Sequence, residues 1–200
     1  MQLFNRKNVT PIIILLVAGF VFYVLRNSDQ KVDAEIALTI GEPWEEMRRR
    51  SSADIPAAVP GAAWFRTPLG IASLRLVDPE YGFKTLPAKF FTVGFNRESR
   101  IDVIHMSPQL EPLPLEEAIG NVLELQEQWR KGGWKPAFTE IDPPFVDTPR
   151  WREDLKNCKS SRAYWRADEK FQTQLNLDCF NDKKFPDTRY LISLELSRPY

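Results

Sequence analysis

The pattern of hydrophobic and polar positions divides the chain into one long apolar segment and a longer mixed region. Residues 9–25 carry no charge, and as a helix these 17 residues would be about 25 Å long. The hydrocarbon core of a bilayer is about 30 Å thick, so the segment is just long enough to span it. No A-x-A-like cleavage site follows Leu25, which favours an uncleaved signal anchor over a signal peptide, with a buried core helix as a further alternative.

The remaining sequence is mixed in polarity, and its periods predict the folded region. Alternation with a period of two predicts strands over 71–77, 89–95, 100–106, 162–167, 171–179 and 190–197. Between them, apolar residues from Leu115 to Trp129 recur at helical spacing, with Pro114 at the start and Gly132 at the end. Thr39 and Glu42 have the spacing of a capping box before a short helix, and another short helix is expected at 150–157.

This order of elements predicts an α+β fold. An N-terminal transmembrane helix is followed by one domain, in which one main helix and one or two short helices pack on a curved antiparallel sheet of about six strands. The predicted divisions are a cytoplasmic N-terminus at 1–8, a transmembrane anchor at 9–25, a tether at 26–38 and a single periplasmic domain at 39–200. The tether residues are polar and show no clear period.

The charge of the chain is balanced overall, with 27 basic and 27 acidic side chains. Residues 1–26 hold three basic and no acidic residues, so the rest of the chain has three more acidic than basic side chains. This balance lacks the basic surface of a nucleic-acid-binding protein, so we expect no nucleic-acid partner. Basic residues flank the apolar segment on both sides, so charge alone does not determine the orientation in the membrane.

The two cysteines of the chain, Cys158 and Cys179, both lie in the predicted domain. An even pair beyond a membrane favours a disulfide formed in an oxidising compartment, whereas two buried free thiols are the alternative. We therefore expect a single-pass protein of the bacterial inner membrane whose C-terminal domain lies in the periplasm. The bond would stabilise the domain by about 3 kcal/mol.

Residues with catalytic potential are sparse. His105 is the single histidine, and strand alternation places it with apolar residues and places the nearest acid, Asp102, on the opposite face, so no Ser-His-Asp triad is indicated. The sequence contains no glycine-rich phosphate loop and no spacing typical of zinc ligands. We therefore predict that the protein is not an enzyme and binds no metal and no cofactor.

A segment rich in aromatic residues and arginine is the candidate interface, because these residue types anchor contacts between proteins. The alternative is ordinary packing of a proline-rich loop on the sheet, and the sequence does not separate the two. The candidate interface residues are Trp129, Trp134, Trp151, Tyr164, Trp165, Arg152 and Arg166.

Two segments, TIGEPWEEMRRRSS at 39–52 and LEPLPLEEAIGNVLELQEQWRKGGW at 110–134, resemble helices of the membrane-anchored immunity proteins that bacteria pair with toxins acting in the periplasm. The resemblance covers about 40 residues and assigns no functional residue. It implies a protein partner, namely a toxin that the domain neutralises by binding. A structural or assembly component of a cell-envelope complex and an envelope hydrolase that uses carboxylates are the alternatives.

Overall fold

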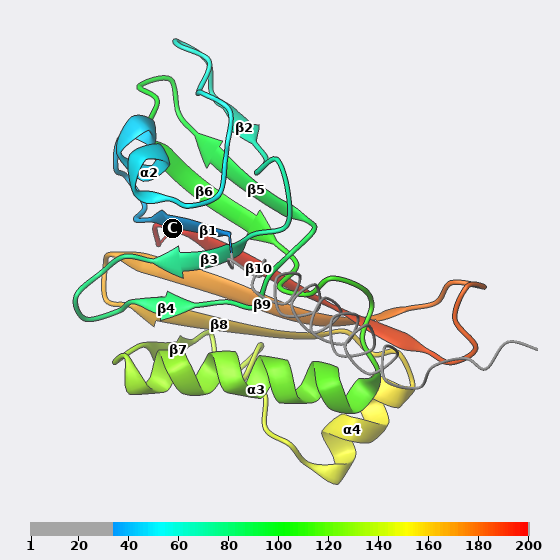
Figure 1. Cartoon of the computed structure of the whole chain (residues 1–200). Coiled ribbons are helices and arrows are strands. Elements are labelled where there is room, and N and C mark those ends of the chain that lie inside the picture. The colour runs from blue at the N-terminus through cyan, green and yellow to red at the C-terminus, as the bar shows by residue number, and fades with distance from the viewer. Residues whose placement is uncertain (1–33, 200) are drawn as a thin grey trace, which may run out of the picture. The chain divides into compact units, whose positions relative to one another are not determined.

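The computed structural model describes residues 34–199 of the chain, which form a sheet-rich α+β domain (Figure 1). The expected cytoplasmic N-terminus at 1–8, the expected membrane helix at 9–25 and most of the expected tether at 26–38 lie outside the described residues. The helices are α2 (Trp44–Arg50), α3 (Leu115–Lys131) and α4 (Pro149–Lys156). The strands are β1 (Glu35–Leu38), β2 (Trp64–Arg66), β3 (Ser73–Leu76), β4 (Phe83–Lys84), β5 (Phe91–Phe95), β6 (Ile101–Met106), β7 (Lys135–Ala137), β8 (Ser161–Ala167), β9 (Phe171–Phe180) and β10 (Arg189–Ser197).

Seven strands form one large antiparallel sheet in the order β2-β5-β6-β10-β9-β8-β7. The two longest strands, β9 and β10, pair along almost their whole length, so that Leu175 and Leu177 lie opposite Leu194 and Ile192. All four of these side chains are buried, whereas the side chains between them are mostly polar. The period of two therefore produces one face directed into the core and one directed toward solvent.

A second, smaller sheet has the order β1-β3-β4, and β1 runs parallel to β3. Ile36, Ala37 and Leu38 of β1 are all buried, which explains why they form a continuous apolar run instead of an alternating pattern. The outer edge of β1 is covered, because the hydroxyls of Ser52 and Ser51 accept hydrogen bonds from its backbone at 2.9 and 3.0 Å. The sequence prediction assigns these residues to the tether, but pairing with β3 makes them part of the fold.

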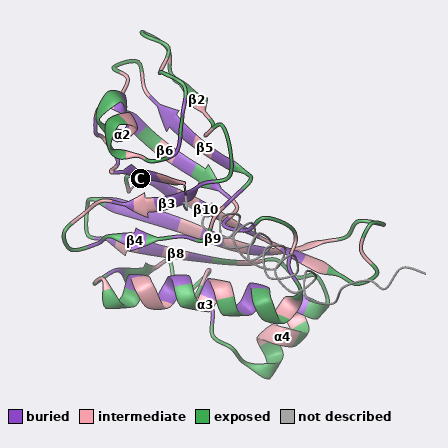
Figure 2. Cartoon of the chain, in the orientation of Figure 1, coloured by how far each residue is buried: buried purple, intermediate pink, exposed green. Residues whose placement is uncertain are grey.

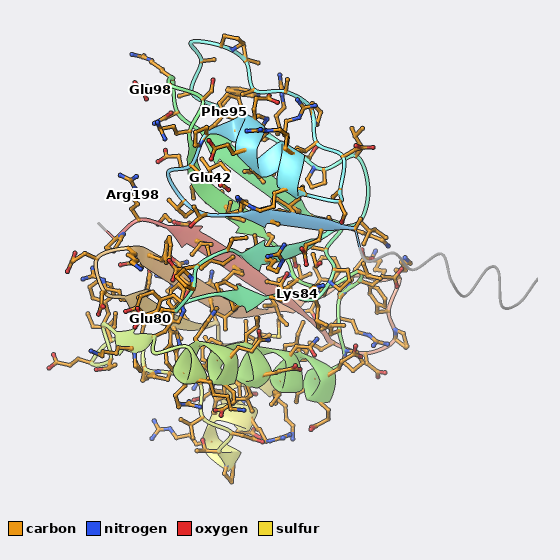
Figure 3. All side chains as sticks on the ribbon, turned by 60° about the vertical axis from the view of Figure 1, so that its left-hand side comes forward. Glu42, Glu80, Lys84, Phe95, Glu98 and Arg198 are labelled. Atoms are coloured by element: carbon orange, nitrogen blue, oxygen red, sulfur yellow. A yellow bond between two sulfur atoms is a disulfide. The ribbon has the colours of Figure 1, made fainter. Side chains whose placement is uncertain are left out.

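One hydrophobic core includes residues of both sheets and of the helices (Figure 2). The main helix α3 contacts β9 and β10, and its buried stripe includes Val122, Leu125 and Trp129. Toward the β5 end of the large sheet, Phe95 packs against Trp44 of α2 with ring centroids 5.0 Å apart (Figure 3). Helix α3 thus covers the middle of the large sheet, and α2 covers its β5 end.

No helix within residues 34–199 is long and apolar enough to cross a membrane. The predicted architecture is wrong in two respects. The large sheet has seven strands instead of about six, and a second sheet with a parallel pair accompanies it. The strands β1, β2 and β7 contain four, three and three residues, which is too short for a period of two to be recognised in the sequence.

Candidate functional site

An open groove of about 590 Å³ lies where β2, β5 and β6 meet at one edge of the large sheet (Figure 1). Ligand sites in proteins are commonly concave, with volumes of about 300–1,000 Å³ and mostly apolar walls. Four of the residues that line this groove are aromatic, and the titratable ones are Asp102 and His105. We therefore treat it as the candidate site.

Three of the four aromatic rings of the groove are unusually exposed for their size, and the fourth, Phe95, is buried. Trp64 is 59%, Phe65 48% and Phe90 58% exposed, while most aromatic residues of the domain are buried. The rings of Trp64 and Phe65 stack with their centroids 5.3 Å apart and their planes inclined by 17°. Exposed apolar surface gathered in one place is typical of a contact surface for another molecule.

Gly94 lines the groove where β5 and β6 approach each other closely. This residue of β5 pairs with Phe65 of β2, and on its other side the chain approaches so closely that an added Cβ would lie 2.8 Å from Cγ1 of Val103. A glycine is therefore needed for β5 and β6 to pack at this point. The pairing of these strands also shifts register between Val93 and Phe95, as a β-bulge does.

This irregularity corrects the sequence prediction for Asp102 and His105. Regular alternation would place them on opposite faces of β6, but in the structure both line the groove. A register shift in the β5–β6 pair changes which side chains share a face, because alternation holds only along an uninterrupted ladder. Sequence alternation therefore separated two residues that the structure brings to one site.

The structure also gives His105 a carboxylate partner that the sequence analysis missed. Glu195 of β10 lies opposite His105 in the register, and its Oε2 atom is 3.5 Å from Nδ1 of the imidazole. Thr92, the cross-strand neighbour on β5, donates its hydroxyl to the backbone oxygen of His105 at 3.3 Å. The Thr92 hydroxyl therefore bonds to the main chain and not to the imidazole. Thr92, His105 and Glu195 thus do not form the contact between nucleophile and base that a hydrolase uses.

Three of the predicted interface residues lie in the core. Trp129, Trp134 and Trp165 are all buried, and the ring of Trp129 lies 6.1 Å from that of Trp134 and 6.0 Å from that of Trp165. Nε1 of Trp134 donates to the backbone oxygen of Tyr81 at 3.0 Å. For these three tryptophans the alternative of ordinary packing holds. They fill the space between α3 and the sheet and offer no surface to a partner.

Trp151 and Arg152, also predicted for the interface, are partly exposed on α4. The ring of Trp151 stacks on Phe145 at 5.4 Å. Arg152 forms ion pairs with Glu116 at 2.6 Å and with Asp147 at 2.5 Å. The hydrogen bond from Arg152 lowers the pKa of the Asp147 carboxyl. The charge of Arg152 is therefore already paired within the domain.

Tyr164 and Arg166, the last two predicted interface residues, lie on β8 near the opposite edge of the large sheet. Both contact Phe138, whose ring is 5.2 Å from that of Tyr164 and 5.2 Å from the guanidinium of Arg166. Their polar atoms bond to β9, with Tyr164 donating to Gln174 at 2.9 Å and Arg166 to Gln172 at 2.9 Å. The structure thus divides the predicted interface between the core and a partly exposed surface around α4 and β8, away from the groove.

Cys158 and Cys179 lie together, as the sequence predicts. Their sulfur atoms are 2.15 Å apart, which is disulfide distance, and their Cα atoms are 5.2 Å apart. Cys158 lies two residues after the end of α4, and Cys179 is near the end of β9. The bond therefore ties α4 to the large sheet.

Comparison with known proteins adds no family to this picture. A scan against protein-family models found no match, and searches of curated proteins and of solved structures also found none. No group of three or more histidine, cysteine, aspartate or glutamate residues suited to a metal ion occurs within residues 34–199. The resemblance to immunity proteins stays a prediction.

Proposed function

We propose that the protein acts by binding another protein, and that the aromatic groove beside β2 is its contact surface. The observation that carries this proposal is the cluster of three half-exposed rings, Trp64, Phe65 and Phe90, around one groove. A fully buried aromatic or large aliphatic side chain contributes about 1.5–3 kcal/mol, so a partner that covers these rings gains substantial affinity. Tryptophan is also among the residue types that dominate binding energy in protein interfaces.

A binding role is favoured over catalysis by the polar residues of the groove. The imidazole of His105 is paired with Glu195, and the neighbouring Thr92 hydroxyl bonds to the main chain. This arrangement places no activated hydroxyl beside the imidazole. We therefore propose that the polar residues orient a partner and that the rings supply the affinity.

In its narrower form, the proposal is that the partner is a toxin that acts in the periplasm. This form rests on the resemblance described above and on the cysteine pair at disulfide distance, which is typical of proteins in oxidising compartments. The domain would then neutralise one toxin in a one-to-one complex. A role in assembling a cell-envelope complex predicts instead several partners that are themselves membrane proteins.

The groove assignment is tested by photo-crosslinking in the cells that produce the protein. Full-length protein carries p-benzoylphenylalanine at position 65 or 90, and the control carries it at position 141, where Ile141 is exposed in the connection between β7 and α4. We expect one discrete adduct from each groove position and none from the control. Adducts from position 141 alone, or none at all, would refute the assignment.

The partner identified by crosslinking is then purified and titrated against variants. Trp64→Ser combined with Phe90→Ser should weaken binding at least 100-fold, because hot-spot truncations each cost about 2 kcal/mol or more. The matched control is Ile141→Ser combined with Val146→Ser, which removes exposed apolar residues elsewhere and should leave affinity unchanged. If the partner is a toxin, the groove variant should also fail to protect cells against it, while a set of several membrane partners would favour the assembly role.

A further inference from the structure

We infer that the groove recognises an arginine side chain, presented by the partner on an extended segment that pairs with the edge of β2. This inference rests on the proposed function and names the chemistry of the partner. It follows from three independent features, which are the charge of the groove, its exposed rings and the difference between the two edges of the large sheet.

The first feature is an unneutralised negative charge. Asp102 is exposed and lines the groove, and within residues 34–199 its carboxylate has no hydrogen-bond or ion-pair partner. None of the described residues that line the groove is a lysine or an arginine. Two arginines nearby in sequence bind main-chain oxygens, Arg66 that of Ala57 at 3.0 Å and Arg100 that of Gly41 at 2.9 Å. A cation from a partner would therefore meet an unpaired carboxylate in a groove that no lysine or arginine of residues 34–199 lines.

The second feature is the set of ring faces beside this carboxylate. A guanidinium group binds favourably over an aromatic face within about 6 Å, and its planar shape allows stacking as well. The domain already uses this contact elsewhere, since Arg166 lies 5.2 Å from the ring of Phe138. Within residues 34–199, no cation is placed in this way over Trp64, Phe65 or Phe90. Rings and carboxylate together form the two kinds of contact that arginine makes best.

The third feature is the difference between the edge strands β7 and β2. Strand β7 contains Pro136, which hinders pairing of this edge with another chain because proline has no N–H. Strand β2 reads Trp64, Phe65, Arg66 and contains no proline. Its edge can therefore accept an extended segment, as proteins do when they add a strand to a sheet. Alternate side chains of such a segment would face the groove.

The experiment uses short peptides as probes and the full-length protein as receptor. The probe is acetyl-Thr-Val-Arg-Val-Thr-amide, and matched peptides replace its arginine with citrulline, lysine or glutamate. Citrulline keeps the shape of arginine and removes the charge. Binding is followed through the indole N–H signal of Trp64 in nitrogen-15 NMR spectra, which is assigned by comparison with Trp64→Phe.

We expect the arginine peptide to shift the Trp64 signal with a millimolar dissociation constant, and citrulline to weaken binding about tenfold. Asp102→Asn should weaken the arginine peptide about five- to tenfold and leave the citrulline peptide unchanged. The matched control is Asp187→Asn, which removes an exposed carboxylate in the β9–β10 connection and should change neither. Unchanged signals from the other tryptophans show that a variant is folded.

Equal binding of the arginine and citrulline peptides, an unaffected Asp102→Asn variant or no binding by any peptide would each overturn the inference. Equal binding of the lysine peptide would overturn the assignment to arginine. These failures are distinguishable from failure of the proposed function, because the crosslinks from positions 65 and 90 do not depend on the charge of the partner.

Discussion

Removal of the bond between Cys158 and Cys179 should measurably destabilise the domain. The two residues are 21 positions apart, and the chain-entropy relation for a closed loop of this length gives about 3 kcal/mol at 25 °C. Replacing both with serine adds little further cost, because Cys158 is exposed and Cys179 is only partly buried. We therefore expect a loss of about 3 kcal/mol in the free energy of unfolding.

The measurement is urea unfolding of the oxidised protein and of the variant Cys158→Ser, Cys179→Ser, followed by tryptophan fluorescence. Reduced wild-type protein is the control, and it should unfold at the midpoint of the double variant. A difference below about 1 kcal/mol between oxidised protein and variant would refute the reasoning. Two free thiols, trapped in protein taken from its own cells, would refute both the bond and the oxidising compartment inferred from it.

Three further predictions concern single contacts. Gly94→Ala brings a Cβ to 2.8 Å from Cγ1 of Val103, so thermal unfolding should show a loss of about 1–3 kcal/mol that Val103→Ala partly restores. Asp168 accepts a hydrogen bond from the Tyr81 hydroxyl at 2.6 Å and raises the pKa of that phenol above its usual value of 10.0. The hydrogen bond therefore stabilises the folded state below pH 10, and this stabilisation is lost as the pH rises further. Ultraviolet titration should show a tyrosine that ionises above the usual pH, and Tyr81→Phe should remove this step. Glu42→Ala deletes a buried carboxylate that is paired with an arginine, and urea unfolding should show a loss of about 2 kcal/mol; an unchanged curve would contradict this.

The elements that could be predicted are those whose signals are local. Helix α3 runs from Leu115 to Lys131, between the Pro114 and Gly132 that the sequence marks as its limits. Proline before the first turn and glycine after the last act within one turn of the chain, so a single sequence reveals them. The same holds for the long strands β9 and β10, whose alternation extends over ten and nine residues.

The capping-box contact between Thr39 and Glu42 is present, but the helix that it predicts begins later in the chain. The backbone N–H of Thr39 does bond to the Glu42 carboxylate, at 2.7 Å. Helix α2 nevertheless begins at Trp44, with Pro43 as its N-cap, so the bond closes a turn before the helix. The carboxylate also pairs with Arg50 at the end of α2, a contact that the spacing alone does not indicate.

The candidate site depends on contacts between distant parts of the chain. Trp64, His105 and Glu195 come from β2, β6 and β10, and the large sheet brings these strands into one region. The sequence left interface and packing open as alternatives for the same reason, since it shows where aromatic residues cluster but not which of them the core buries. Trp129 and Trp64 are alike in residue type, yet one is buried and the other is 59% exposed.

By itself, the sequence determined the long helix, the long strands and the cysteine pair, because these follow from residue type, short-range spacing and chain length. The tertiary structure decided the parallel strand β1, the short edge strands and the bulge that brings Asp102 to the groove beside His105. Such features are stabilised by partners tens of residues away and leave no local period. The groove therefore became visible only when β2, β5 and β6 were placed side by side.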